Sequence, residues 1–200
     1  MMGALAFLGA APDAREQRGL DWAQVSIVVG GDFLLGQAAR LIAKFGREVS
    51  WSFSQWLADL ATLRAQRLAG DPNVTADASS AALYEFPARL GAGLAGADAD
   101  TVEALADFGS ECGRAFLHVD EVLALTGRRT RLDTTLESFT ANRLATDGLA
   151  SGDSAQVTAA QAAAAEAEER GRTASARLPE TPGRELLEAF LVGVCGPARA

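Results

Sequence analysis

The sequence predicts an all-α protein of one domain, and three observations point to it. Apolar residues recur at steps of three and four along nearly the whole chain, runs of β-branched residues are few, and Gly, Pro and Asp mark the turns. The 200 residues are 48% hydrophobic, which suffices for a single sizeable core. No internal repeat is apparent, so we expect one helical domain over residues 1–200.

Three helices are predicted in the N-terminal half. The first covers about residues 21–44, and the second, at about residues 49–69, carries Trp51 and Trp56. The segment DPNVTAD has the composition of a loop and precedes a third helix at about residues 79–94.

The fourth helix, at about residues 99–126, has the most regular pattern in the chain. Its apolar stripe consists of Leu105, Phe108, Cys112, Phe116, Val119 and Leu123. Gly109 and Gly113 form a notch of small residues on this stripe, where a neighbouring helix can approach closely. We therefore expect this helix to be the centre of a bundle.

The C-terminal part is also helical in pattern. A basic stretch leads into a short predicted helix at about residues 134–145. Residues 155–178 are rich in Ala and Glu, which favours a helix, but they offer few large apolar residues and predict weak packing. The last helix begins at Pro182, and its apolar face consists of Leu186, Leu187, Phe190 and Leu191.

Composition excludes several classes of function. A net charge of -8 and a pI near 4.7 argue against nucleic-acid binding. Cys112 and Cys195 have neither metal-ligand nor disulfide-framework spacing, so we interpret them as reduced packing residues of a cytoplasmic protein. Residues 1–11 are apolar but too short to span a bilayer and lack the basic flank of a signal peptide, so we expect neither export nor membrane insertion.

Two acidic residues near the end of the fourth helix are candidate metal ligands. Carboxylates at positions i, i+1 and i+4 of a helix converge, and Mg²⁺ prefers such oxygen ligands. The sequence FLHVDEVLALTG supplies Asp120 and Glu121 but has Ala124 at the third position. The alternative interpretation is a solvated acidic helix end. His118, the only histidine, lies beside Asp120, but no Gly-x-Ser-x-Gly turn accompanies it, which favours chance proximity over a nucleophilic triad.

Several segments resemble the trans-isoprenyl diphosphate synthase (polyprenyl synthetase) family. FLHVDEVLALTG is similar to its second aspartate-rich motif, and GGDFLLGQAARLIAKFG is similar to its A-G-D-Y-L-L-A-x-A helix. TLRAQRLAG is similar to a helix of that family that ends in a Gln, here Gln66. SSAALYEFPARLGAGLAGAD resembles the segment that begins with Lys-Thr, and ARLPETPGRELLEAF resembles the last helix pair. The matches follow the family's order.

The resemblance implies a helical bundle of the isoprenoid synthase type and a diphosphate substrate held through Mg²⁺. It also implies which residues contact the ligands. The substrate-binding residues would be Asp32, Gln66, Arg128 and Arg129, and the metal ligands would be Asp120 and Glu121. For Asp32, a structural cap or packing role is the open alternative.

The sequence departs from the family at several of these positions. Ala124 replaces the third carboxylate, Leu117 replaces a Gln, and Ser79-Ser80 replace Lys-Thr. The sequence before Gly30 contains no first aspartate-rich motif, so we expect a bundle that lacks the family's N-terminal helices. Metal stabilisation of a leaving diphosphate is worth several kcal/mol, and we therefore assign no catalytic residue and expect little or no activity from the chain alone.

Three hypotheses follow from the resemblance and these departures. The first is a non-catalytic or regulatory subunit of a heteromeric isoprenyl diphosphate synthase, in a homo- or hetero-oligomer with an intact subunit. The second is a diverged prenyltransferase or terpene-synthase-like enzyme, which would bind one allylic diphosphate through Asp120, Glu121 and the arginines after Gly127, with Mg²⁺. The third is a decaying reading frame, or one whose start at Met1 is misplaced.

Overall fold

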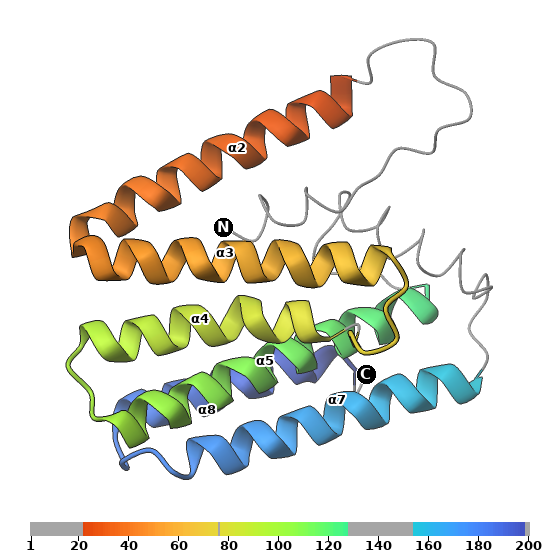
Figure 1. The fold of residues 1–200 in the computed structure, drawn as a ribbon. Coiled ribbons are helices and arrows are strands. Elements are labelled where there is room, and N and C mark those ends of the chain that lie inside the picture. The colour runs from red at the N-terminus through yellow and green to blue at the C-terminus, as the bar shows by residue number, and fades with distance from the viewer. Residues whose placement is uncertain (1–21, 76, 128–153, 199–200) are drawn as a thin grey trace.

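A computed structural model describes residues 22–75, 77–127 and 154–198 of the chain (Figure 1). Within these ranges the chain forms six α-helices and no strand, which confirms the predicted all-α class. The helices are α2 (Trp22–Ile42), α3 (Arg47–Leu68), α4 (Ala78–Leu94), α5 (Ala99–Leu125), α7 (Ser154–Ser175) and α8 (Pro182–Cys195). Short 3₁₀ helices follow α2 at Ala43–Phe45 and α8 at Gly196–Ala198.

The helix boundaries agree with the periodicity of the sequence. Each helix in the described ranges begins within two residues of its predicted start. The short helix expected at residues 134–145 lies outside the described residues. Local signals account for two of the starts: Asp98 and Thr181 accept hydrogen bonds from the backbone N–H groups of Thr101 and Arg184, and so cap α5 and α8.

Helix α5 lies at the centre of the bundle, as predicted. It packs between α4 and α7 and also contacts α8 (Figure 1). Phe108, Cys112 and Ala115 of α5 are at most 3% exposed and share a core cluster with Leu191 and Val194 of α8. The apolar stripe predicted on this helix therefore forms the main core.

The two glycines of the predicted notch bring α4 and α5 into backbone contact. A Cβ atom at Gly109 would lie 2.6 Å from the carbonyl oxygen of Tyr84 and 2.9 Å from the Cβ of Ala88. A Cβ at Gly113 would collide with the carbonyl oxygen of Ser80. Only glycine fits at either position, so the notch fixes the register between α4 and α5.

Helix α7 packs more closely than its composition suggested. Its buried face consists of Ala160, Ala164, Ala167, Gly171 and Ala174. These small residues recur at steps of three and four, which lets α7 lie close along α5. The prediction of weak packing is wrong because close backbone approach provides the contacts that large side chains would otherwise make.

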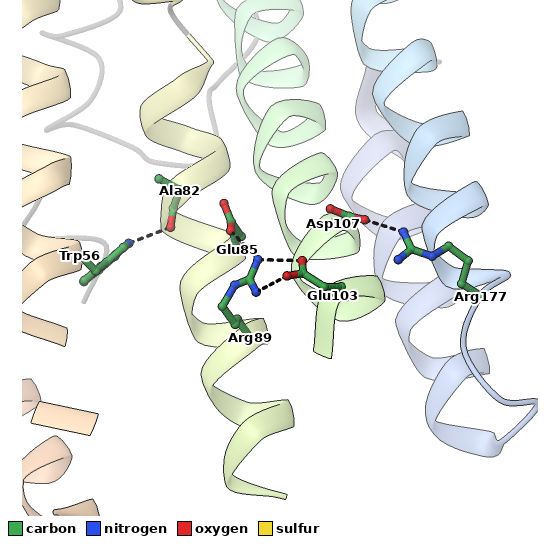
Figure 2. Close-up of polar contacts among 7 residues, drawn as sticks. All are labelled: Trp56, Ala82, Glu85, Arg89, Glu103, Asp107 and Arg177. Carbon is green, nitrogen blue, oxygen red and sulfur yellow. Dashed lines mark hydrogen bonds and ion pairs between the residues drawn. The ribbon is translucent and has the colours of Figure 1, made fainter. Parts of the chain in front are cut away.

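Helices α2 and α3 form the other side of the molecule. Phe53, Trp56 and Leu60 of α3 are buried against α4, where Trp56 stacks on Phe86 with ring centroids 4.7 Å apart. The indole Nε1 of Trp56 donates a hydrogen bond of 2.9 Å to the carbonyl oxygen of Ala82 (Figure 2). Trp51 is 66% exposed, so the two tryptophans of α3 occupy opposite environments.

We predict that Gly113→Ala lowers the free energy of unfolding by about 1–3 kcal/mol or more, because the new methyl group must displace the α4 backbone. The matched control is Gly91→Ala on α4, where a Cβ meets no atom within 4 Å and the backbone is helical. That change should raise the free energy of unfolding by about 0.5–1 kcal/mol through helix propensity. Urea titration followed by circular dichroism measures the free energy of unfolding of both variants. Equal changes in the two variants would contradict the close contact between α4 and α5 at Gly113.

Candidate functional site

The two acidic residues of the predicted metal site lie near the C-terminal end of α5. Asp120 is 6% exposed, whereas Glu121 is half-buried and its Oε2 lies 3.5 Å from Nδ1 of His118. Because consecutive helical residues point about 100° apart, the two carboxylates have different surroundings. The half-buried Ala124 occupies the third position of the motif with a methyl group. In the described part of the chain, no group of three or more His, Cys, Asp or Glu residues is placed to hold a metal ion.

A cluster of ion pairs lies next to these carboxylates. Arg114 of α5 approaches Asp77, which immediately precedes α4, at 3.4 Å, and it lies 3.8 Å from Glu111. Glu111 also pairs with Arg170 of α7 at 2.9 Å. The cluster therefore links α4, α5 and α7, and its role in the described structure is to hold three helices together.

The carboxyl group of Asp77 has a perturbed proton affinity. Burial alone would raise the pKa of Asp77, but a hydrogen bond from the Thr75 side chain and the positive charge of Arg114 outweigh it, with smaller contributions from the backbone of Asp77 and from His118. The pKa is therefore lower than that of an ordinary aspartate. Since the folded state holds this proton more weakly than the unfolded chain, the group stabilises the fold above about pH 4 and loses this effect as the pH falls through its folded pKa.

Two of the predicted substrate-binding residues lie on helices other than the one that carries Asp120. Asp32 is exposed in the middle of α2 and Gln66 is exposed near the end of α3. Among the described residues, neither side chain has a hydrogen-bond or ion-pair partner, and Asp32 caps no described helix. Arg128 and Arg129 lie outside the described residues.

Sequence reasoning missed Arg114 and Asp77, the ion pair near the acidic residues of α5. Arg114, His118 and Glu121 occur at i, i+4 and i+7 of one helix, and this spacing places them on one face. That signal was available in the sequence. The position of Asp77 beside them was not, because it depends on how α4 is aligned with α5.

A second group of ion pairs links neighbouring helices near the opposite end of α5 (Figure 2). Arg89 of α4 binds Glu103 of α5 at 2.9 Å and Glu85 at 3.2 Å. Hydrogen bonding to Glu103 is the main reason why the pKa of the Arg89 guanidinium is raised, even though burial opposes it. Arg177, in the segment after α7, pairs with Asp107 of α5. These contacts are half-exposed, and two of them join α5 to α4 and to the segment after α7, so we assign them a structural role.

The two thiols are core groups. Cys112 and Cys195 are buried and free, as the sequence analysis predicted. Burial, followed by interaction with Cys195 and Glu111, raises the pKa of the Cys112 thiol to about 12. At neutral pH Cys112 is therefore an uncharged packing residue without the thiolate that metal binding or nucleophilic attack requires.

We predict that Asp77→Asn lowers the free energy of unfolding by about 1 kcal/mol at pH 7, because Arg114 keeps its charge and loses its main partner. The difference from the wild type should shrink as the pH falls below about 4, where the carboxyl becomes protonated first in the unfolded chain and then, at lower pH, in the folded protein. The control is Asp107→Asn, whose pair with Arg177 is half-exposed and should change stability by only a few tenths of a kcal/mol. Urea titrations over a pH series measure these effects, and a pH-independent difference would contradict the assignment.

The arrangement of the helices is shared with known structures. Neither a protein-family model nor a curated protein sequence matches the chain. A decaprenyl diphosphate synthase from Rhodobacter capsulatus is similar to it with a TM-score of 0.62 and 23% identity, over 96% of this chain and 75% of the synthase. A geranylgeranyl pyrophosphate synthase from Corynebacterium glutamicum, complexed with calcium and isoprenyl diphosphate, gives a TM-score of 0.58 and 19% identity, over 88% and 68% of the two chains.

Another structure of the Corynebacterium glutamicum enzyme gives the same TM-score of 0.58 at 20% identity, and the match covers 66% of that chain. No helix among the described residues has the length and apolar character needed to cross a membrane. The helices of the described residues and the similarity to these synthases confirm the predicted all-helical class and the predicted type of bundle. The chain has the fold of the trans-isoprenyl diphosphate synthases.

Proposed function

We propose that this chain is a non-catalytic subunit of a heteromeric isoprenyl diphosphate synthase. The observation that carries the proposal is the acidic end of α5 within an otherwise retained fold. Ala124 supplies no ligand, Asp120 is 6% exposed, and Glu121 lies beside His118. The described helices are arranged as in a synthase subunit, whereas the end of α5 offers two carboxylates where the motif has three.

The energetic consequence favours an inactive subunit over a weak enzyme. Mg²⁺ requires nearly octahedral oxygen coordination, and two carboxylates at positions i and i+1 provide a poor framework for it. Metal stabilisation of a leaving diphosphate is worth several kcal/mol, and each 1.4 kcal/mol or so changes the rate about tenfold. Loss of one ligand set is therefore sufficient to reduce turnover by orders of magnitude.

The outer face of α2 is the surface that we assign to the partner. We call it the α2 surface, and it consists of Val29, Phe33, Leu34 and Leu41 of α2 and Phe45 of the 3₁₀ helix that follows, which are between 42% and 63% exposed. The opposite side of α2 packs on α3 through Leu35 and Ile42. Figure 1 shows α2 at the edge of the bundle, where no other described helix covers it. Contiguous exposed apolar residues of this kind mark protein interfaces.

An intact synthase subunit is the occupant that fits this surface. It shares the fold of this chain and would supply the metal ligands that α5 lacks, while this chain would contribute packing and influence product length. The two buried free thiols fit a reducing cytoplasmic setting for such a complex. Co-expression with intact synthases of the same genome, followed by co-purification and analysis of product chain length, tests the proposal. A chain that neither associates with a synthase nor changes its rate or products would contradict it.

We predict that geranyl diphosphate shows no tight magnesium-dependent binding to the purified chain. The reason is the incomplete ligand set at the end of α5. Calorimetric titration with and without Mg²⁺ measures this, with an intact synthase as the positive control. Tight binding that requires Mg²⁺, is lost in Asp120→Ala and persists in Asp59→Ala, which changes an exposed carboxylate on α3, would instead support the diverged-enzyme hypothesis.

We also predict that Phe33→Asp combined with Leu41→Asp abolishes association through the α2 surface. Two charges within an apolar contact would have to be desolvated, so affinity should fall by two orders of magnitude or more, at about 2–4 kcal/mol in total. The control is Leu186→Asp at a 73% exposed position of α8, a helix on the other side of the bundle from α2 (Figure 1). Light scattering of each variant, alone and mixed with the synthase, gives the result. Unchanged association of the double variant would exclude this surface.

A further inference from the structure

Cys112 and Cys195 are buried thiols that come from distant parts of the chain. Cys112 lies in the middle of α5 and Cys195 ends α8, and they are the only cysteines in the sequence. Both are free, and they are 1% and 2% exposed. They belong to one core cluster, in which α5 packs against α7 and α8. The fold therefore brings the two thiols into the same packed core.

The contacts around Gly171 define the position of α8 along α5. A Cβ atom at Gly171 of α7 would lie 2.9 Å from Cδ2 of Leu191 and 3.6 Å from Cβ of Glu111. The side chain of Leu191 on α8 and that of Glu111 on α5 therefore approach the same point of α7. Cys112 is the residue after Glu111, and Cys195 lies one turn after Leu191, so the two thiols are within about one turn of the same level.

A second contact further along the bundle lies on the other side of the thiols. Ala198, which follows α8, belongs to a core cluster with Val119 and Leu123 of α5. The two helices therefore advance in the same direction, and both thiols lie between this contact and the one on α7. After burial, interaction with Cys195 is the next contribution to the raised pKa of the Cys112 thiol, and such an interaction weakens with distance. The two thiols are therefore neighbours in the core.

The closed bundle protects both thiols from reaction. Burial is the main cause that raises the pKa of the Cys112 thiol to about 12, so the thiolate that reacts with oxidants is scarce at neutral pH. Helix α8 is covered on one face only, since Leu186 is 73% exposed and Phe190 is 52% exposed. Elements with few covering contacts open at a lower free energy than the centre of a domain. Local opening of α8 is therefore the route by which solvent reaches Cys112 and Cys195.

We propose that Cys112 and Cys195 are a site of reversible oxidation, at which hydrogen peroxide produces a disulfide bond that fastens α8 to α5. With α8 open, one thiolate attacks an oxygen of the peroxide, the O–O bond breaks, and a sulfenic acid and one water result. The second thiol then attacks the sulfenic sulfur, the S–S bond forms, and the hydroxyl group leaves as a second water.

The reaction is balanced without a further reagent. Two thiols and one hydrogen peroxide give one disulfide and two waters, and two electrons pass from the sulfur atoms to the peroxide. A dithiol reductant reverses the oxidation by thiol–disulfide exchange. The site does not depend on the proposed subunit role, because neither thiol belongs to the α2 surface or to the acidic end of α5.

The test is oxidation of the fully reduced full chain with a stoichiometric amount of hydrogen peroxide at low protein concentration. Mass spectrometry of unreduced proteolytic fragments should show Cys112 linked to Cys195 within one chain. Because the bond constrains the unfolded chain, the melting temperature should rise by about 5 °C or more, and dithiothreitol should reverse the rise. Disulfides between chains only, sulfinic acid without a link, or a link that leaves the melting temperature unchanged or lower would overturn the proposal.

A displaced thiol distinguishes packing in the core from chance encounter in an unfolded chain. Cys195→Ala combined with Ala189→Cys moves the thiol to an exposed position of the same helix. This double variant should form no link to Cys112 under the same conditions, and Cys195→Ala alone should show no rise in melting temperature on oxidation. A link in the double variant as rapid as in the wild type would refute the proposal. The fragment analysis of the wild type needs no variant, so a folding defect in either variant does not affect it.

Discussion

The backbone contact between α4 and α5 at Gly109 and Gly113 determines the rest of the arrangement. Because a methyl group at Gly113 would collide with the Ser80 carbonyl, the two helices meet at one depth and in one alignment. Asp77, three residues before Ser80, is thereby brought beside Arg114, the residue after Gly113. The charged cluster at this end of the bundle is therefore a consequence of a contact between residues that carry no charge.

The same alignment acts on the other side of α4. With α4 fixed on α5, its opposite face presents Ala82 and Phe86 to α3, where Trp56 stacks and donates its hydrogen bond. The α3/α4 contact ends at Ser79, because the first turn of α4 begins there. The α3/α4 contact thus also depends on packing that two glycines of α5 set on the other side of α4.

The sequence predicted the parts of the fold that depend on local pattern. The stripe on α5 and the starts of the helices follow from apolar spacing and capping, and the notch follows from two glycines four residues apart. The close packing of α7 was missed, because alanines contribute little to a hydrophobic pattern although they permit close approach. The environment of Asp77 was also beyond reach, since it depends on the register between α4 and α5, which the local pattern of neither helix specifies.

The predicted site residues also differ in whether local sequence pattern or the neighbouring helices determine their surroundings. Asp120 and Glu121 were selected by the spacing of carboxylates on one helix, whereas Asp32 and Gln66 were named through resemblance and are exposed, without described side-chain partners. A motif can be located by its spacing, but what its side chains contact depends on the neighbouring helices. Sequence therefore located the acidic helix end better than it defined the site around it.

Alanine at position 124, where the motif has a carboxylate, also favours the stability of α5 itself. Three carboxylates within one turn repel each other when no metal ion is bound, and like charges at i and i+4 destabilise a helix by a few tenths of a kcal/mol. Alanine removes that repulsion from Asp120 and has the highest helix propensity. The core of α5 depends on Phe108, Cys112 and Val119 and not on its acidic end. An alanine at position 124 is therefore compatible with the fold, whether or not a partner subunit supplies metal ligands as proposed.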